Sequence, residues 1–185
     1  MSFEESLICH AAPTLASIKI ANLYNFKFDS DKDCQMTINH FNSLMNPKGI
    51  YIELLKEAGD FYLIYVYRKT HLQKQLDDPE IQNLLVEYGY PTKCEMKQYI
   101  DVLKMRLKAE EGFPHEIGLL LGYPVADVKA FIETNGQNCI ACGDWKAYGD
   151  EKEAKCLFCK YKHCREVYIS VYGAGRKFVD MLVSA

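Results

Sequence analysis

The feature that most constrains the fold is a pair of apolar runs separated by a short polar connector. The first run covers residues 50–55 and the second covers residues 61–67, and both are rich in aromatic and β-branched side chains. The connector, residues 56–60, contains Gly59. Two such runs around a glycine-containing connector predict a β-hairpin. Each run is far shorter than the roughly 20 apolar residues that a membrane-spanning helix needs, so we expect no membrane association.

Helical patterns and further strand patterns surround this hairpin. Ser2 and Glu5 form a capping box at the start of a first helix, which we expect Pro13 to end. Further helices are predicted over 32–46, 69–76, 79–88, 93–111, on both sides of Gly122, over 151–162 and after Gly175, with strands over 17–26, 144–148 and 166–172. Strands early and late with helices between them indicate an α+β fold: a single domain over 1–185, with helices packed on a mostly antiparallel sheet.

The charge pattern excludes some classes of partner. The chain carries 22 Lys and Arg against 25 Asp and Glu, a net charge of −3, and no segment forms the basic face that nucleic-acid binding requires. The N-terminus has Glu4 and Glu5 where a secretory signal needs basic residues. We therefore expect a cytoplasmic protein that binds no nucleic acid. The sequence identifies no cofactor and leaves the oligomeric state open.

The sequence has eight cysteines, and four of them have metal-ligand spacing. Cys139 and Cys142 form one C-x2-C pair, and Cys156 and Cys159 form another, which is a spacing typical of a structural zinc site. In the predicted helix over 151–162, however, Cys156 and Cys159 lie together on the face opposite the apolar stripe. They are either metal ligands or exposed thiols. In a cytoplasmic protein, disulfides are the less expected alternative.

His115 and Glu116 directly follow Pro114 at a predicted helix start. The helix dipole there favours the carboxylate of Glu116 and a neutral imidazole at His115. A neutral histidine is able to act as a base for a nearby thiol such as Cys142. The structural alternative is that Glu116 caps the first helical turn and His115 bonds locally.

Several sequence blocks together resemble a bacterial family, the domain of unknown function 3793. The most specific is Phe113-Pro-His-Glu-Ile-Gly-Leu-Leu-Leu-Gly-Tyr-Pro-Val-Ala-Asp-Val. The others are Ala12–Ala16 with Lys19, Asn46–Ile50, Tyr65–Arg68 and Cys142–Gly149. The blocks occur in the family's order and cover essentially the whole chain. Cys9-His10 departs from the family's His-Cys order, and cysteines at 139, 156 and 159 are not part of the pattern.

The family has no established activity, but the resemblance implies which polar residues are candidates for ligand binding or catalysis. Lys19, Arg68 and Lys146 are expected to give a polar cleft an anion-binding character, with Tyr148 also binding the ligand. If the protein is an enzyme, Cys142 is the expected nucleophile or redox thiol, with His115 as its base and Glu116 beside it. The alternatives are a non-catalytic binding or regulatory module built on the chain's 13 Tyr and 9 Phe, or a domain stabilised by zinc.

Overall fold

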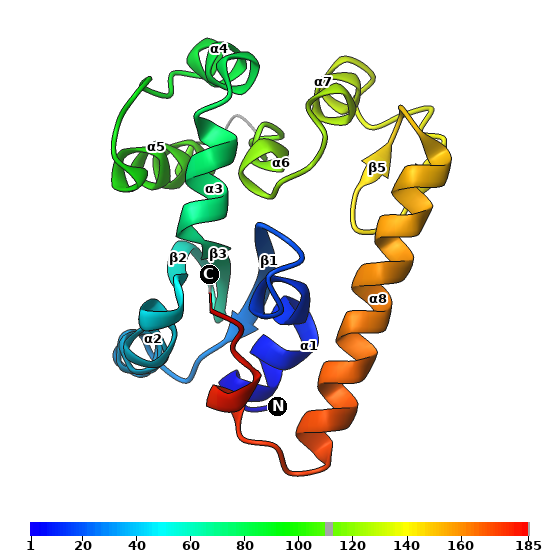
Figure 1. Ribbon diagram of the computed structural model, residues 1–185. Coiled ribbons are helices and arrows are strands. Elements are labelled where there is room, and N and C mark those ends of the chain that lie inside the picture. Colours follow the sequence, from blue (N-terminus) through cyan, green and yellow to red (C-terminus); the bar gives the residue numbers. More distant parts are fainter. Residues whose placement is uncertain (110–112, 185) are drawn as a thin grey trace.

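The computed structural model describes residues 1–109 and 113–184, and it is organised around a three-stranded antiparallel sheet (Figure 1). The strands are β1 (Ala21–Lys27), β2 (Ile50–Ala58) and β3 (Phe61–Arg68). β3 lies in the centre, paired with β1 on one side and β2 on the other. The predicted hairpin is therefore confirmed as β2 and β3. Gly59, at the turn, has a φ of 61°, a left-handed conformation that glycine adopts without strain.

Both faces of the central strand are buried, which explains why β3 is apolar almost throughout. Ile64 and Val66 point to one face of the sheet, and Tyr65 and Tyr67 point to the other. All four side chains are buried. Helices therefore have to cover both faces, and the α+β fold with helices packed on an antiparallel sheet is confirmed.

The first face is covered by helices from the two ends of the chain. They are α1 (Phe3–Leu15), α2 (Asp31–Met45), and the short 3-10 helices η1 (Asn46–Lys48) and η2 (Phe178–Met181). Leu7 of α1, Phe41 of α2 and Phe178 of η2 share one apolar cluster with Ile64. The two ends of the chain thus meet in the same core.

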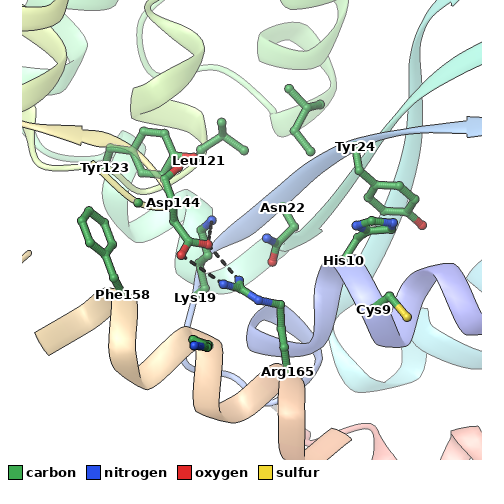
Figure 2. A pocket seen from close by; sticks show the side chains of 13 residues that line it. Cys9, His10, Lys19, Asn22, Tyr24, Leu121, Tyr123, Asp144, Phe158 and Arg165 are labelled. Carbon is green, nitrogen blue, oxygen red and sulfur yellow. Dashed lines mark hydrogen bonds and ion pairs between the residues drawn. The ribbon is translucent and has the colours of Figure 1, made fainter. Parts of the chain in front are cut away.

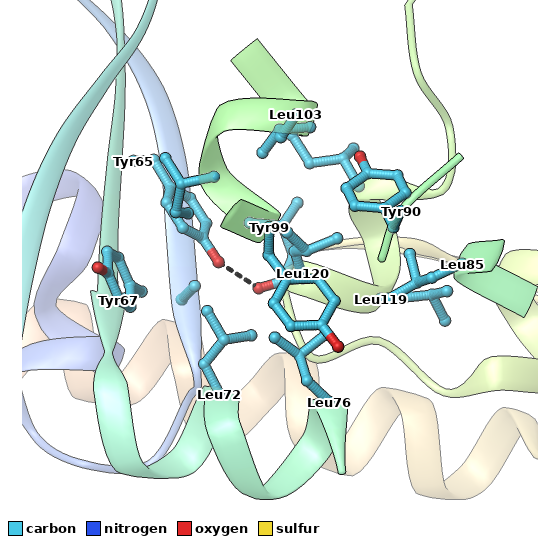
Figure 3. Packing of buried hydrophobic residues seen from close by; sticks show 14 of the residues in the cluster. Tyr65, Tyr67, Leu72, Leu76, Leu85, Tyr90, Tyr99, Leu103, Leu119 and Leu120 are labelled. Carbon is cyan, nitrogen blue, oxygen red and sulfur yellow. Dashed lines mark hydrogen bonds between the residues drawn. The ribbon is translucent and has the colours of Figure 1, made fainter. Parts of the chain in front are cut away.

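The second face is covered by the middle of the chain. Its helices are α3 (Lys69–Leu76), α4 (Pro79–Glu87), α5 (Met96–Lys108), α6 (Ile117–Leu120) and α7 (Val125–Glu133). Figure 3 shows how Tyr65 reaches from the sheet into this core, where its hydroxyl donates to the Leu120 carbonyl at 2.6 Å. This bond attaches α6 to the sheet.

A small hairpin and the longest helix form the remaining part of the fold. The hairpin strands are β4 (Ala141–Cys142) and β5 (Lys146–Ala147), and the helix is α8 (Glu151–Gly173), which packs along α1 (Figure 1). Trp145 and Ala147 of the hairpin pack on Ala154 and Tyr161 of α8. No helix within residues 1–109 and 113–184 is both long and apolar enough to cross a membrane.

The structure corrects the predicted strand over 166–172, which is the second half of α8. The segment is rich in β-branched and aromatic residues, which favour a strand. Two of its tyrosines, Tyr168 and Tyr172, are however four residues apart, as on one face of a helix, and both bond to other parts of the fold. The Tyr168 hydroxyl donates to the Met181 carbonyl at 2.9 Å, and the Tyr172 hydroxyl donates to Glu4 at 2.6 Å. Tertiary packing along α1 and η2 therefore overrides the strand propensity of this segment.

Two helix boundaries also differ from expectation. Pro13 does not end α1 but lies in its last turn, where a missing N–H removes only one bond of the helix. α5 begins at Met96 rather than at 93, because the Glu95 backbone N–H is capped by the Gln98 side chain at 3.1 Å. Its predicted end at 111 lies outside the described residues. The last helix after Gly175 is reduced to η2.

Candidate functional site

A polar pocket lies where α1, β1, α8 and the β4–β5 hairpin meet (Figure 2). Its volume is about 610 Å³. The polar side chains come from separate segments: His10 from α1, Lys19 from the loop before β1, Asp144 from the β4–β5 turn and Arg165 from α8. The pocket is therefore a product of the tertiary fold.

The backbone around Pro13 positions Lys19. The N–H groups of Ile18 and Lys19 both donate to the Pro13 carbonyl, at 3.0 and 3.1 Å, which folds the chain back after α1. Ser17 takes a left-handed conformation, with a φ of 63°, to make this turn. The Lys19 side chain is consequently directed inward, and the residue is only 7% exposed.

Lys19 lies between one carboxylate and two aromatic rings. Its Nζ is 3.7 Å from Asp144 Oδ1, and it lies 5.3 Å from the ring centre of Tyr123 and 5.5 Å from that of Tyr161. Burial lowers the pKa of Lys19 to about 8; Asp144 opposes this shift, and the nearby Arg165 adds to it. The ammonium group is thus less stable here than in water, even with Asp144 beside it.

Asp144 is shared between two cations. Arg165 donates to both of its oxygens, from Nη1 at 2.9 Å and from Nη2 at 3.3 Å, as Figure 2 shows. This two-bond geometry is the stronger of the two pairings. Lys162 also lines the pocket. The described lining residues thus include three cationic side chains and one carboxylate, but Lys162 is largely exposed and lies 3.9 Å from Glu166.

His10 and Tyr24 form a further wall of this pocket. Their rings stack with centres 4.8 Å apart and planes 25° apart. Burial and, less strongly, the positive charge of Arg165 lower the pKa of His10. Since both effects favour the neutral imidazole, His10 offers a hydrogen-bonding group without adding a full charge near neutral pH.

A second pocket of about 440 Å³ adjoins the first. Its walls are mostly apolar and include Ile117, Val128, Phe131 and Trp145. Three side chains line both pockets: Leu23, Leu121 and Tyr123. A polar and an apolar cavity therefore lie on either side of a common wall.

Comparison with known proteins places the whole site inside one family region. The model of the family described as "Protein of unknown function (DUF3793)" matches residues 7–182. The chain belongs to this family. The DUF3793 match contains every residue that lines the two pockets. Neither the curated proteins nor the solved structures gave a match to this chain.

The four predicted anion-binding residues of this DUF3793 protein lie in different places. Lys19 lines the polar pocket, whereas Lys146 lines the apolar one, where its Nζ donates to the Gly136 carbonyl at 2.8 Å. Tyr148 lines neither pocket, and its hydroxyl accepts a bond from Thr134 at 3.4 Å. The structure does not bring these side chains together around one ligand.

Arg68, the third predicted cation, is fully buried beneath α1. Its Nε donates to the Thr14 carbonyl at 2.6 Å, and its Nη2 donates to the carbonyls of Leu15 and Val183 at 2.7 and 2.8 Å. Arg68 thus ties the end of α1 and the C-terminal segment to β3. Its three bonds give Arg68 a role in the fold, and it lines neither of the two pockets.

Of the predicted catalytic residues, His115 and Glu116 line a small cavity together, whereas Cys142 does not line it. His115 lines the apolar pocket, where its ring is 4.9 Å from that of Phe131. Glu116 is 1% exposed and accepts bonds from Arg106 and, at 3.2 Å, from the Tyr90 hydroxyl. Cys142 is exposed on β4 and lines neither pocket. Among the described residues, no hydrogen bond joins Cys142 to His115.

The cysteines do not assemble into a metal site in the described part of the chain. No group of three or more His, Cys, Asp or Glu side chains there has the geometry to hold a metal ion. A structural zinc needs four such ligands, so the arrangement does not support the zinc alternative through Cys139, Cys142, Cys156 and Cys159. All eight cysteines are free thiols, and Cys142, Cys156 and Cys159 are exposed.

Sequence reasoning missed Asp144, Arg165 and His10 as site residues. Arg165 belongs to a basic stretch on α8 that is typical of a solvated helix face, and its role depends on the inward turn of the β4–β5 loop. Asp144 did have a signal, because it lies within the block Cys142–Gly149 that resembles the family. His10 lies in a segment that departs from the family pattern.

Proposed function

We propose that this DUF3793 protein binds a small anion, a carboxylate or a phosphate, in the polar pocket. The observation that carries this proposal is the convergence of Lys19, Lys162 and Arg165 on a cavity with one carboxylate, Asp144. Lys19 and Arg165 against the one acid leave an excess of positive charge that a bound anion neutralises, whereas Lys162 is largely exposed and lies 3.9 Å from Glu166. The volume of about 610 Å³ suits a small molecule.

The state of Lys19 supports the same conclusion. Its pKa falls to about 8 because burial removes water from the ammonium group and Asp144 does not fully replace it. Asp144 is engaged by Arg165 through two bonds at 2.9 and 3.3 Å, but lies 3.7 Å from Lys19. An anion that enters the pocket supplies the missing partner of Lys19, and low solvent access strengthens that attraction.

We propose binding rather than catalysis as the basic activity. A thiol nucleophile would need its base within hydrogen-bond reach, whereas Cys142 is exposed outside both pockets. The eight free thiols support a reducing, cytoplasmic location. The net charge of −3 does not favour a nucleic-acid partner.

Calorimetric titration with acetate and inorganic phosphate tests this function. The variant Lys19→Met keeps the length and apolar stem of the side chain and removes its charge, while Arg165 continues to neutralise Asp144. A charge-assisted hydrogen bond contributes about 1.5–3 kcal/mol, so anion affinity should fall about 10-fold or more.

The matched control is Lys27→Met. Lys27 lies at the other end of β1, is 58% exposed and pairs with Asp60 at 2.6 Å, so this variant loses one positive charge away from the pocket. It should bind anions within about twofold of the original protein, since exposed charges are screened by salt. Equal affinities in Lys19→Met and Lys27→Met would refute the assignment.

A further inference from the structure

The wall between the two pockets consists of side chains. Tyr123 is its main element: the Lys19 Nζ lies 5.3 Å from its ring centre, and the ring stacks on Trp145 with centres 5.3 Å apart and planes 25° apart. Tyr123 is held in place by its hydroxyl, which donates to the Asp144 carbonyl at 2.9 Å. The ammonium group of Lys19 and the apolar surface around Trp145 are thus both in contact with one aromatic ring.

The second pocket offers a ligand little beyond apolar surface, because its charged groups already have partners. The Asp127 carboxylate accepts bonds from Trp145 Nε1 at 2.7 Å and from the backbone N–H groups of Tyr148 and Gly149 at 2.8 and 3.0 Å. The Lys146 ammonium donates to a backbone carbonyl at 2.8 Å. Among the described lining residues, His115 adds a polar side chain for which no hydrogen bond is seen.

We propose that the two pockets bind one amphipathic ligand, with its anionic group in the Lys19 pocket and its apolar body in the pocket lined by Ile117, Val128, Phe131 and Trp145. This inference rests on the proposed function and names its ligand class: a small organic acid with a short acyl chain or a single ring. The apolar body passes over Tyr123, Leu121 and Leu23, which line both pockets. The anion keeps Lys19 as its partner.

A homologous series of carboxylates is the sharpest test. Titration with acetate, butyrate and hexanoate holds the charge constant and lengthens only the apolar body. Each methylene that becomes buried should raise affinity about fourfold over this series. A ligand confined to the polar pocket would instead show nearly constant affinity.

A substitution in the apolar pocket tests whether the acyl chain of the ligand lies there. Phe131→Ala should lower the affinity for hexanoate about 10-fold and leave that for acetate unchanged, since only the longer chain reaches this side chain. Phe131 is half-buried, so the substitution leaves the main core intact. Phe61→Ala is the matched control, because Phe61 is 54% exposed and lines neither pocket.

The outcomes separate this inference from the proposed function. A gain of about 15-fold at each two-methylene step of the series, reduced in Phe131→Ala, together with binding that weakens in Lys19→Met, supports both. Lys19-dependent binding of acetate with no gain for hexanoate overturns the two-pocket inference and leaves anion binding intact. Binding that grows with chain length but is the same in Lys19→Met overturns both, because the ligand is then selected by its apolar part alone.

Discussion

The buried ammonium group of Lys19 should make the stability of the protein rise with pH in the weakly alkaline range. The pKa of Lys19 is lowered from 10.5 to about 8 in the folded chain. Between these two values the unfolded chain holds the proton and the folded chain has released it. Since the unfolded state then binds more protons, the free energy of unfolding increases as pH rises through this window.

The magnitude follows from the size of the shift. A pKa of about 8 in the folded chain against 10.5 in the unfolded chain corresponds to about 3 kcal/mol. Most of that window lies between pH 7 and pH 10, so about 2 kcal/mol should appear over this range. The residue is only 7% exposed, so solvent screening reduces this figure little.

The assay is urea denaturation of the original protein and Lys19→Met at pH 7, 8, 9 and 10. Tyrosines and cysteines titrate in the same range, but they contribute equally to both proteins and cancel in the difference. The stability of the original protein relative to Lys19→Met should increase by about 2 kcal/mol from pH 7 to pH 10. A difference that stays constant within about 0.5 kcal/mol would refute the reasoning, because Lys19 would then be charged and fully compensated.

Three further predictions concern residues that hold the fold together around the pockets. Arg68→Met should lower the free energy of unfolding by about 3 kcal/mol in urea denaturation, because the carbonyls of Thr14, Leu15 and Val183 each lose a charge-assisted bond from its guanidinium group. Asp127→Asn removes one acceptor oxygen, so it should shift the fluorescence of Trp145, the sole tryptophan, and lower the free energy of unfolding by about 2 kcal/mol. An unchanged emission spectrum would contradict the buried bond between Trp145 and Asp127. Gly143→Ala should destabilise by about 1–3 kcal/mol, because its Cβ would lie 2.4 Å from Phe158, and Phe158→Leu should recover part of this loss.

The parts of the fold that the sequence predicted well are those determined by neighbours along the chain. The β2–β3 hairpin has two apolar runs and a glycine turn within 19 residues, Ile50–Arg68, so its pairing is local. Ser2 and Glu5 likewise form their capping box within one helical turn. Such features need no knowledge of the rest of the molecule.

α8 shows where local reasoning fails. Its second half has the composition of a strand, but Tyr168 and Tyr172 bond to residues that lie far away along the chain or beyond the helix. Those partners exist only after the sheet, α1 and η2 have come together. The helix is therefore selected by tertiary contacts and not by propensity.

Of the residues that form the polar pocket, the sequence predicted only Lys19. Lys19 was identified through the family resemblance, while its partners Asp144 and Arg165 come from segments more than 120 residues later in the chain. Cys142 and His115 are each in blocks that resemble the family, but the β4–β5 hairpin leaves the thiol at the surface. Spacing along a chain does not determine convergence in space.

The claim that an anion occupies the Lys19 pocket is tested most directly by the titration of Lys19 itself. In NMR spectra of protein labelled at the lysine ε-carbon, the Lys19 signal is the one absent from Lys19→Met. Its pKa should be about 8 without ligand and should rise by at least about one unit in saturating acetate, because a nearby negative charge favours the ammonium form. A Lys19 pKa that is the same with and without acetate would contradict the account.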